Sequence, residues 1–212
     1  MKENIKKIAV VGAGTMGHGI AQSFAQAGYR VSMMSRTQKT LDRAMALVHS
    51  SLSAMAEEGV LDRKSIPSVV GRITTTTSIE EAARDADIAF ETMAEDKEAK
   101  KEVFAQLDQY CPPRTLLASN TTYLNIFDFV ETSRPEKVLI AHWYTPPHLI
   151  PLVEVVKGPR TDNASVQLVV DLLKKMNKKP AVMEKFIPGF MINRFQVAIQ
   201  REVYYLVDND YM

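Results

Sequence analysis

The sequence of 212 residues contains one cysteine, Cys111, and has a formal net charge of only +1. A single cysteine excludes a disulfide within the chain and favours a reducing compartment, so we expect a cytoplasmic protein. The lysines and arginines are not gathered into one block, which gives no indication of a nucleic-acid partner. No apolar run approaches the roughly 20 residues of a membrane span, so we expect no membrane association. The histidine, cysteine and carboxylate residues show no spacing typical of a metal site.

The sequence does contain short β-rich apolar runs that alternate with helical patterns. Strands are expected at residues 6–12, 29–35, 72–78, 86–95, 111–120, 136–144, 152–158 and 179–184, and helices at residues 15–27, 37–59, 79–84, 97–110 and 163–176. Such alternation is typical of βαβ units around a parallel sheet. We therefore predict an α/β fold in which residues 1–186 form a doubly wound, mostly parallel sheet of the Rossmann type.

The last part of the chain differs in character from the rest. Residues 187–212 show one long helical pattern with apolar positions on more than one side, which is more than a surface helix needs. We interpret this segment as the first helix of a helical C-terminal domain that is truncated here. Two explanations stay open: the natural protein is short, or the chain is a fragment of a longer one.

The stretch VVGAGTMGHGIA contains the pattern G-x-G-x-x-G between the first expected strand and the first expected helix. Gly12 permits a tight turn, Gly14 lets a pyrophosphate approach the backbone, and Gly17 allows the helix and strand to pack closely. The start of the helix offers free N–H groups and a positive dipole end, with Thr15 and Met16 beside it. The alternative is a glycine-rich turn that binds nothing, but the context favours a dinucleotide cofactor.

The end of the second expected strand reads Ser35-Arg36-Thr37. NAD sites usually place an aspartate or glutamate here, where it binds the ribose 2′-hydroxyl. A guanidinium and two hydroxyls would instead bind a 2′-phosphate, which a carboxylate would repel. The segment therefore favours NADP or tolerance of both cofactors. The alternative is that Arg36 is a solvated surface residue and the cofactor is NAD.

The segment AHWYTPPHLIPLVEVV places His142 and Glu154 inside two apolar runs that are separated by Pro146 and Pro147. Either both are ordinary polar residues at strand ends, or a turn at the prolines folds the glutamate back onto the imidazole. In the second case a base of near-neutral proton affinity is joined to a carboxylate that fixes its tautomer. Beside a hydride acceptor, such a pair would serve the oxidation of a secondary alcohol.

Five separated motifs read GAGTMGHGIA, ETMAEDKEAKKEVFAQLD, SNTTYL, HWYTPPHLIPLVEV and GFMINR. In their order and spacing they resemble the L-3-hydroxyacyl-CoA dehydrogenase family, over nearly the whole chain. That family includes relatives that act on small hydroxy acids, such as L-gulonate dehydrogenase of the lambda-crystallin type and L-carnitine dehydrogenase. The resemblance implies an oxidoreductase that transfers a hydride between NAD or NADP and the 3-hydroxy group of an acyl-CoA. It also implies a homodimer, provided that the C-terminal domain is present.

The resemblance further implies roles for single residues. His142 matches the catalytic histidine of the family, and Glu154 matches its acidic partner. Thr122 falls where the family has a serine that bonds the reacting oxygen, and Asn193 matches an asparagine that helps to hold the substrate. A simple helix-start cap is an alternative role for Asn193. The matching positions on the cofactor side of the site are Glu95, Lys100 and Asn120.

The sequence departs from the family pattern at two places. The family motif HFFNP is HWYTP here, so Thr145 replaces an asparagine, and the acid at the end of the second strand is absent. Lys39 and Arg43, on the second expected helix, neither require nor exclude a CoA group. An acyl-CoA is the first choice of substrate, a small free hydroxy acid is the second, and a non-catalytic, crystallin-like cofactor-binding protein is the third interpretation.

Overall fold

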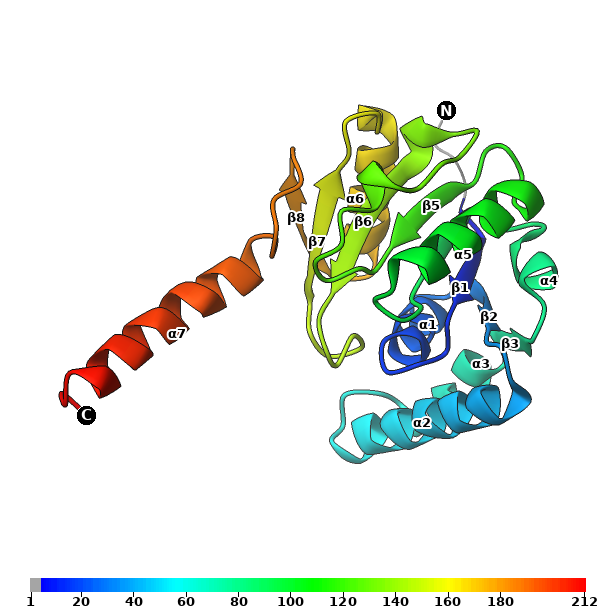
Figure 1. Ribbon diagram of the computed structural model, residues 1–212. Helices are drawn as coiled ribbons and strands as arrows, with labels where there is room; N and C mark the ends of the chain where they lie inside the picture. Colours follow the sequence, from blue (N-terminus) through cyan, green and yellow to red (C-terminus); the bar gives the residue numbers. More distant parts are fainter. Residues whose placement is uncertain (1–4) are drawn as a thin grey trace.

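The computed structural model describes residues 5–212, and its centre is an eight-stranded sheet (Figure 1). The strands lie in the order β3-β2-β1-β4-β5-β6-β7-β8. Their bounds are β1 (Lys7–Val11), β2 (Arg30–Met34), β3 (Ile73–Thr76), β4 (Ile88–Glu91), β5 (Leu116–Ser119), β6 (Val138–Trp143), β7 (Leu152–Lys157) and β8 (Lys179–Met183). Every neighbouring pair is parallel except β6 and β7, which are antiparallel. The predicted α/β, mostly parallel, Rossmann-type sheet is confirmed.

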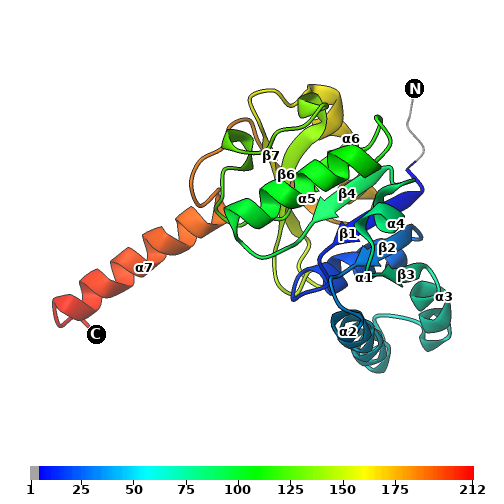
Figure 2. The same ribbon diagram turned by 45° about the vertical axis from the view of Figure 1, so that its right-hand side comes forward.

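Helices cover both faces of this sheet (Figure 2). The helices that pack into one apolar cluster are α1 (Gly17–Gln26), α2 (Gln38–Glu57), α3 (Ile66–Val70) and α6 (Asn163–Lys175). On the other face the cluster is formed by α4 (Ile79–Ala83) and α5 (Lys97–Tyr110). Short 3-10 turns lie at Arg63–Ser65, Ile126–Asp128 and Pro135–Lys137. The sequence patterns did not predict α3 or these turns.

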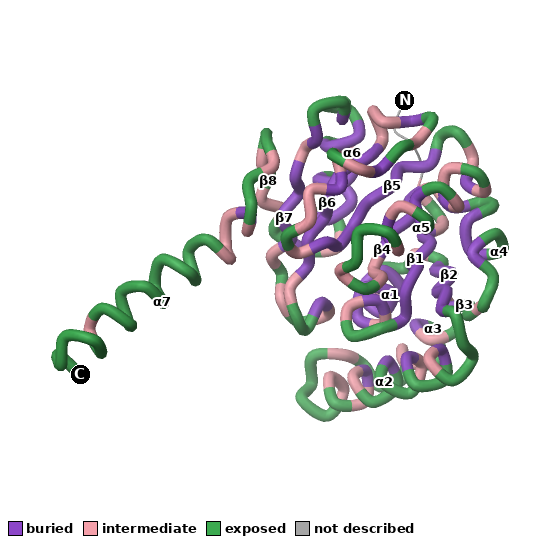
Figure 3. Tube along the Cα trace, in the orientation of Figure 1, coloured by how far each residue is buried: buried purple, intermediate pink, exposed green. Residues whose placement is uncertain are grey.

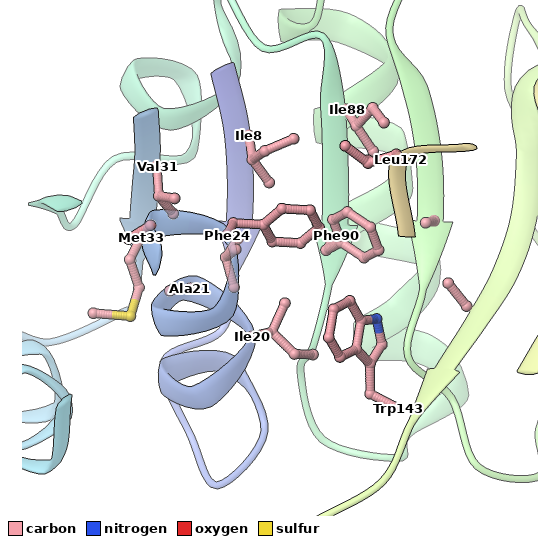
Figure 4. Packing of buried hydrophobic residues seen from close by; sticks show 14 of the residues in the cluster. Ile8, Ile20, Ala21, Phe24, Val31, Met33, Ile88, Phe90, Trp143 and Leu172 are labelled. Carbon is pink, nitrogen blue, oxygen red and sulfur yellow. The ribbon is translucent and has the colours of Figure 1, made fainter. Parts of the chain in front are cut away.

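The strands are apolar throughout because both of their faces are buried. In β1, Ile8 and Val10 join the cluster on one face of the sheet, while Ala9 and Val11 join the cluster on the other. Figure 3 shows this buried central sheet beneath more exposed helices. At the centre of the first cluster, the ring of Phe24 lies 5.0 Å from that of Phe90 and 5.7 Å from that of Trp143 (Figure 4).

The strand order changes direction at β1, which lies between β2 and β4. In open α/β sheets a ligand binds outside the carboxyl ends of the strands at such a switch point. The segments that leave these ends begin with Gly12 after β1, Ser35 after β2 and Thr92 after β4. Residues predicted to bind a cofactor therefore meet at one edge of the sheet, although they are far apart in the sequence.

The helix α7 (Ile192–Asp208) extends away from the sheet and contains no buried residue (Figures 1 and 3). Its exposed side chains include large apolar ones such as Phe195, Ile199 and Tyr204. The division into a domain of residues 1–186 and a second domain from residue 187 stays a prediction, and residues 1–4 lie outside the described part. Among residues 5–212, no helix has both the length and the apolar character that a membrane crossing requires.

Candidate active site

The glycine-rich loop has the geometry that its sequence predicts. Gly12 has a φ of +114°, and a Cβ atom there would lie 2.6 Å from the carbonyl oxygen of Thr92. A Cβ at Gly17 would lie only 1.7 Å from the carbonyl oxygen of Gly12, so neither position accepts a side chain. Gly14 has open space where its Cβ would be. The N-cap of α1 is Met16, which makes no side-chain cap, so no capping side chain covers the start of the helix, and the loop fits a dinucleotide pyrophosphate.

The segment after β2 presents a cation but no acid. Ser35 is buried, and its backbone N–H donates to the carbonyl of Thr76 at 3.2 Å. The hydroxyl of Thr37 accepts from the N–H of Thr40 at 3.3 Å, which makes Thr37 the N-cap of α2. Arg36 is exposed, and within residues 5–212 its guanidinium has no hydrogen bond or ion pair. Of the three predicted contacts, Arg36 is therefore the one whose side chain is both exposed and without a bond among the described residues.

His142 and Glu154 face each other across the antiparallel pair of β6 and β7. Nδ1 of the imidazole lies 3.0 Å from Oε2 of the carboxylate. The histidine is 4% exposed and the glutamate 0%. The chain reverses between the two strands at Pro146 and Pro147, so the second of the two interpretations of this segment is the one that the structure has.

Glu154 accepts four hydrogen bonds although it is completely buried. Its Oε2 accepts from His142 and, at 2.6 Å, from the phenol of Tyr144. Its Oε1 accepts from the backbone N–H groups of Met191 and Ile192, at 2.8 and 3.0 Å, where α7 begins. Burial alone raises the pKa of Glu154, but the bonds from His142, Tyr144, Ile192 and Met191 outweigh it and lower this pKa. The glutamate is therefore held as a carboxylate that joins the imidazole to α7.

The imidazole of His142 packs against two aromatic rings, and one of its nitrogens has no hydrogen-bond partner among the described residues. The ring centre of Tyr144 lies 4.6 Å away in an edge-on arrangement, and that of Phe190 lies 5.2 Å away. Within residues 5–212, Nε2 has no hydrogen-bond partner, and it is not among the buried polar atoms that lack one. With Nδ1–H bound to a carboxylate, Nε2 is the lone-pair nitrogen that can accept a proton.

The turn between β6 and β7 packs against the glycine-rich loop. The hydroxyl of Thr145 lies 3.0 Å from Sδ of Met16. A Cβ at Gly19, in the first turn of α1, would lie 2.9 Å from Cδ of Pro147. The structure therefore brings the histidine's hairpin and the expected cofactor loop together. It also places Thr145, the residue that departs from the family pattern, at their contact.

A second buried carboxylate lies at the carboxyl end of β4. Glu91 is 0% exposed and accepts from the ammonium of Lys100 at 2.9 and 3.0 Å, and from the hydroxyl of Ser119 at 2.5 Å. The same ammonium lies 3.3 Å from Oε2 of Glu95. Lys100 is only 1% exposed, so its buried ammonium links α5 to the carboxyl end of β4. The sequence patterns assigned Glu91 only to a strand, and gave no signal for its ion pair.

Glu95 anchors the loop that follows β5. Its carboxylate accepts from the hydroxyl of Thr121 and from the N–H groups of Thr122 and Tyr123, at 2.9 and 3.1 Å. Burial raises the pKa of Glu95, but the bonds from Thr121 and Tyr123, the charge of Lys100 and the bond from Thr122 lower it below the usual value. This anchor fixes the position of Thr122, whose own hydroxyl has no partner within the described residues.

Comparison with known proteins supplies the family. The family model described as "3-hydroxyacyl-CoA dehydrogenase, NAD binding domain" matches residues 7–186. The chain belongs to the 3-hydroxyacyl-CoA dehydrogenase family. It is thus similar to oxidoreductases with a nicotinamide-binding domain, and the suspected resemblance is confirmed.

Two relatives and one solved structure illustrate the likeness. The 3-hydroxybutyryl-CoA dehydrogenase of Clostridioides difficile is 36% identical over 197 residues, which cover 92% of this chain and 69% of that protein. The L-carnitine dehydrogenase of Streptomyces griseus is 33% identical over 208 residues, which cover 98% of this chain and 61% of that protein. The crystal structure of 3-hydroxybutyryl-CoA dehydrogenase from Escherichia coli has a TM-score of 0.92 and 33% identity, and the match covers 97% of this chain and 43% of that one.

Asn120 and Asn193 are the remaining predicted positions in this member of the 3-hydroxyacyl-CoA dehydrogenase family. Oδ1 of Asn120 accepts from the backbone N–H of Trp143 at 2.8 Å, which links the end of β5 to that of β6. Asn193 is the second residue of α7, and its side chain makes no cap, because the N-cap position is Met191. Glu154 supplies that capping instead. Within residues 5–212, no group of three or more His, Cys, Asp or Glu side chains is arranged to hold a metal ion.

Proposed function

We propose that this chain forms the cofactor-binding and proton-transfer part of a dehydrogenase that oxidises the 3-hydroxy group of a 3-hydroxyacyl-CoA. The observation that carries this proposal is the pair of His142 and Glu154, with Nδ1 held at 3.0 Å and Nε2 open. The hairpin that bears the pair touches the glycine-rich loop through Thr145 and Met16. A proton acceptor beside a dinucleotide loop is what alcohol oxidation requires.

The two side chains have distinct tasks in this proposal. A bound nicotinamide supplies the hydride acceptor. Nε2 of His142 takes the proton from the substrate hydroxyl, and returns it to the carbonyl oxygen in the opposite direction. Glu154 keeps the other ring nitrogen protonated and stabilises the imidazolium, as the aspartate does in a Ser-His-Asp site. Thr122 and Asn193 are proposed as hydrogen-bond donors to the substrate oxygen.

We propose that the cofactor site accepts NADP at least as well as NAD. Arg36 is exposed and unpaired within the described residues, and no carboxylate follows β2 before α2 begins. Thr37 is occupied as the cap of α2, so Arg36 rather than the threonine carries the expected contact with a 2′-phosphate. Calorimetric titration with both cofactors tests this choice. Arg36→Ala is expected to weaken NADP binding and leave NAD binding unchanged, and a strong NAD preference in the parent chain contradicts the proposal.

A small free hydroxy acid is the second candidate substrate. The relative that is an L-carnitine dehydrogenase is 33% identical to this chain, close to the 36% of the acyl-CoA enzyme. Lys39 and Arg43 are exposed on α2, where they neither demand nor forbid a CoA group. A non-catalytic, crystallin-like role is the third candidate, and the intact His142–Glu154 pair counts against it. The cytoplasm, and a homodimer where a C-terminal domain completes the chain, belong to the same proposal.

A rate screen separates these candidates. Oxidation of 3-hydroxybutyryl-CoA, gulonate and carnitine would be measured with NAD and with NADP, each by absorbance of the reduced cofactor. We expect the highest kcat/KM with the acyl-CoA. A higher kcat/KM with carnitine or gulonate would show that the substrate is a small hydroxy acid. Tight cofactor binding without turnover of any substrate would support the non-catalytic role.

A further inference from the structure

We propose that Tyr144 is a positioning residue that weakens the hold of Glu154 on the imidazolium and thereby lets His142 act as a base at lower pH. The inference rests on the proposed function, because it takes His142 as the proton carrier. The phenol hydroxyl of Tyr144 bonds to Glu154, and within the described residues it makes no hydrogen bond to the imidazole or to the glycine-rich loop. It acts through the carboxylate.

The geometry places Tyr144 and His142 in competition for one oxygen. The phenol lies 2.6 Å from Oε2 of Glu154, and Nδ1 of the histidine lies 3.0 Å from the same atom. Tyr144 directly follows β6, and the bond from its phenol to Oε2 places it on the same side of the hairpin as His142 and Glu154. The two rings meet edge-on, with 4.6 Å between their centres and 61° between their planes. The shorter of the two bonds is thus the one made by the phenol.

The other oxygen of Glu154 cannot adjust to this competition. Oε1 is fixed by the N–H groups of Met191 and Ile192, so the carboxylate cannot rotate away from Tyr144 without giving up the start of α7. All four acceptor positions of the carboxylate are filled. Burial, followed by the bond to Glu154 and its charge, raises the pKa of Tyr144, so the phenol stays protonated and remains a donor.

The consequence concerns the proton on His142. Each donor to a carboxylate draws on its negative charge, which leaves less to stabilise a neighbouring imidazolium. When the hydroxyl of Tyr144 is removed, His142 is the one remaining donor to Oε2 of Glu154 among the described residues. The imidazolium then gains stability and holds its proton to higher pH. In the alcohol-oxidation direction, where the neutral ring is needed, the acid limb of kcat/KM moves upward in pH.

The test is Tyr144→Phe, which removes one hydroxyl and keeps the ring that packs on His142. The chain has four histidines, so the C–H signals of the imidazoles can be followed by NMR against pH, and the signal missing from His142→Ala identifies the one of interest. We expect the titration midpoint of His142 to rise by about 0.5–1 pH unit, from a gain of order 1 kcal/mol in the imidazolium. The acid limb of kcat/KM is expected to follow, with little change on the alkaline side.

Two further variants show whether the effect passes through the carboxylate. Tyr110→Phe removes a hydroxyl at the end of α5 and is expected to leave the His142 midpoint where it was. In a Glu154→Gln background, Tyr144→Phe is expected to move the midpoint by less than half as much as in the parent. If that double variant does not fold, the single-variant titration decides by itself.

The outcomes distinguish this inference from the proposed function. An unchanged midpoint in Tyr144→Phe, or a drop in kcat at every pH without a shift of the profile, overturns the positioning role even if the chain is active. A raised midpoint in a chain that oxidises none of the substrates supports the positioning role and rejects the dehydrogenase activity. The NMR titration requires no turnover, so each result stands independently.

Discussion

Glu95 is half-buried and Glu154 is completely buried, yet the two carboxylates are held in the same way. Each carboxylate accepts from one hydroxyl and from backbone N–H groups of a following segment. Each also faces one nitrogen, since the ammonium of Lys100 lies 3.3 Å from Glu95 and Nδ1 of His142 lies 3.0 Å from Glu154. For each, burial raises the pKa and the hydrogen bonds bring it below the usual value. Each therefore stays ionised and fastens a piece of irregular backbone, the loop after β5 in one case and the start of α7 in the other.

The two sites differ in the base that faces the carboxylate. Glu95 faces Lys100, which is 1% exposed and shared with Glu91, and lysine keeps its charge across the physiological range. Glu154 faces His142, whose second nitrogen is open and whose residue type changes charge near neutral pH. The same kind of carboxylate contacts thus gives a structural anchor where the partner is Lys100. Where the partner is His142, they give a site that can move a proton.

The largest expected effect comes from removal of the titrating base. His142→Ala is expected to lower kcat by about 10²- to 10⁴-fold, the usual contribution of a general acid or base. Cofactor binding should be unaffected, because the glycine-rich loop keeps its own bonds to Thr92. Steady-state rates and calorimetry with the cofactor measure the two properties. A rate close to that of the parent chain would reject the role of the histidine.

Removal of the fixed base should act on stability instead. Lys100→Met leaves two carboxylates, Glu91 and Glu95, without their shared cation, and the loss of one partner from a buried pair costs about 3–5 kcal/mol. The matched control is Lys101→Met on the exposed side of α5, whose pair with Glu98 contributes about 0–1 kcal/mol. Urea unfolding of both variants measures the difference. Equal unfolding free energies would show that the buried cluster is not an anchor.

The elements that the sequence predicted are those whose signals are local. Alternating apolar runs and helical patterns follow from the period of each element, and they gave the sheet and its main helices. Gly12 and Gly17 were found because they belong to a G-x-G-x-x-G pattern between a strand and a helix, and the structure shows that neither position accepts a side chain. The His142–Glu154 hairpin was foreseen because two prolines mark its turn, and because the motif resembles one of a known family.

The elements that the sequence did not predict depend on contacts between distant segments. The sequence patterns assigned Glu91 only to a strand, because no local pattern indicates that the side chain of Lys100 is buried and bonded to it. The place of Glu95 on the cofactor side stays a prediction, and its bonds to the loop after β5 had no local signal in the sequence. The capping of α7 by Glu154 joins residues 37 and 38 positions apart, so no local cap motif exists to be recognised.

The smallest expected effect concerns pH and compares the two glutamates directly. Both carboxyls have a lowered pKa in the folded chain, so the unfolded chain binds more protons as the pH falls below the usual glutamate value of about 4.3. The stability that they contribute is complete above that value and is lost as the pH falls through the lowered pKa of each. Glu95→Gln is expected to reduce the slope of unfolding free energy against pH by up to about 1.4 kcal/mol per pH unit below pH 4.3.

Glu154→Gln is the matched variant, and it should reduce the same slope in the same direction. Urea titrations between about pH 3 and pH 6 measure the slopes of the parent chain and of both variants. The two glutamates titrate independently if the double variant loses the sum of the two changes. A slope that neither substitution alters would mean that these anchors do not govern the acid stability of the fold.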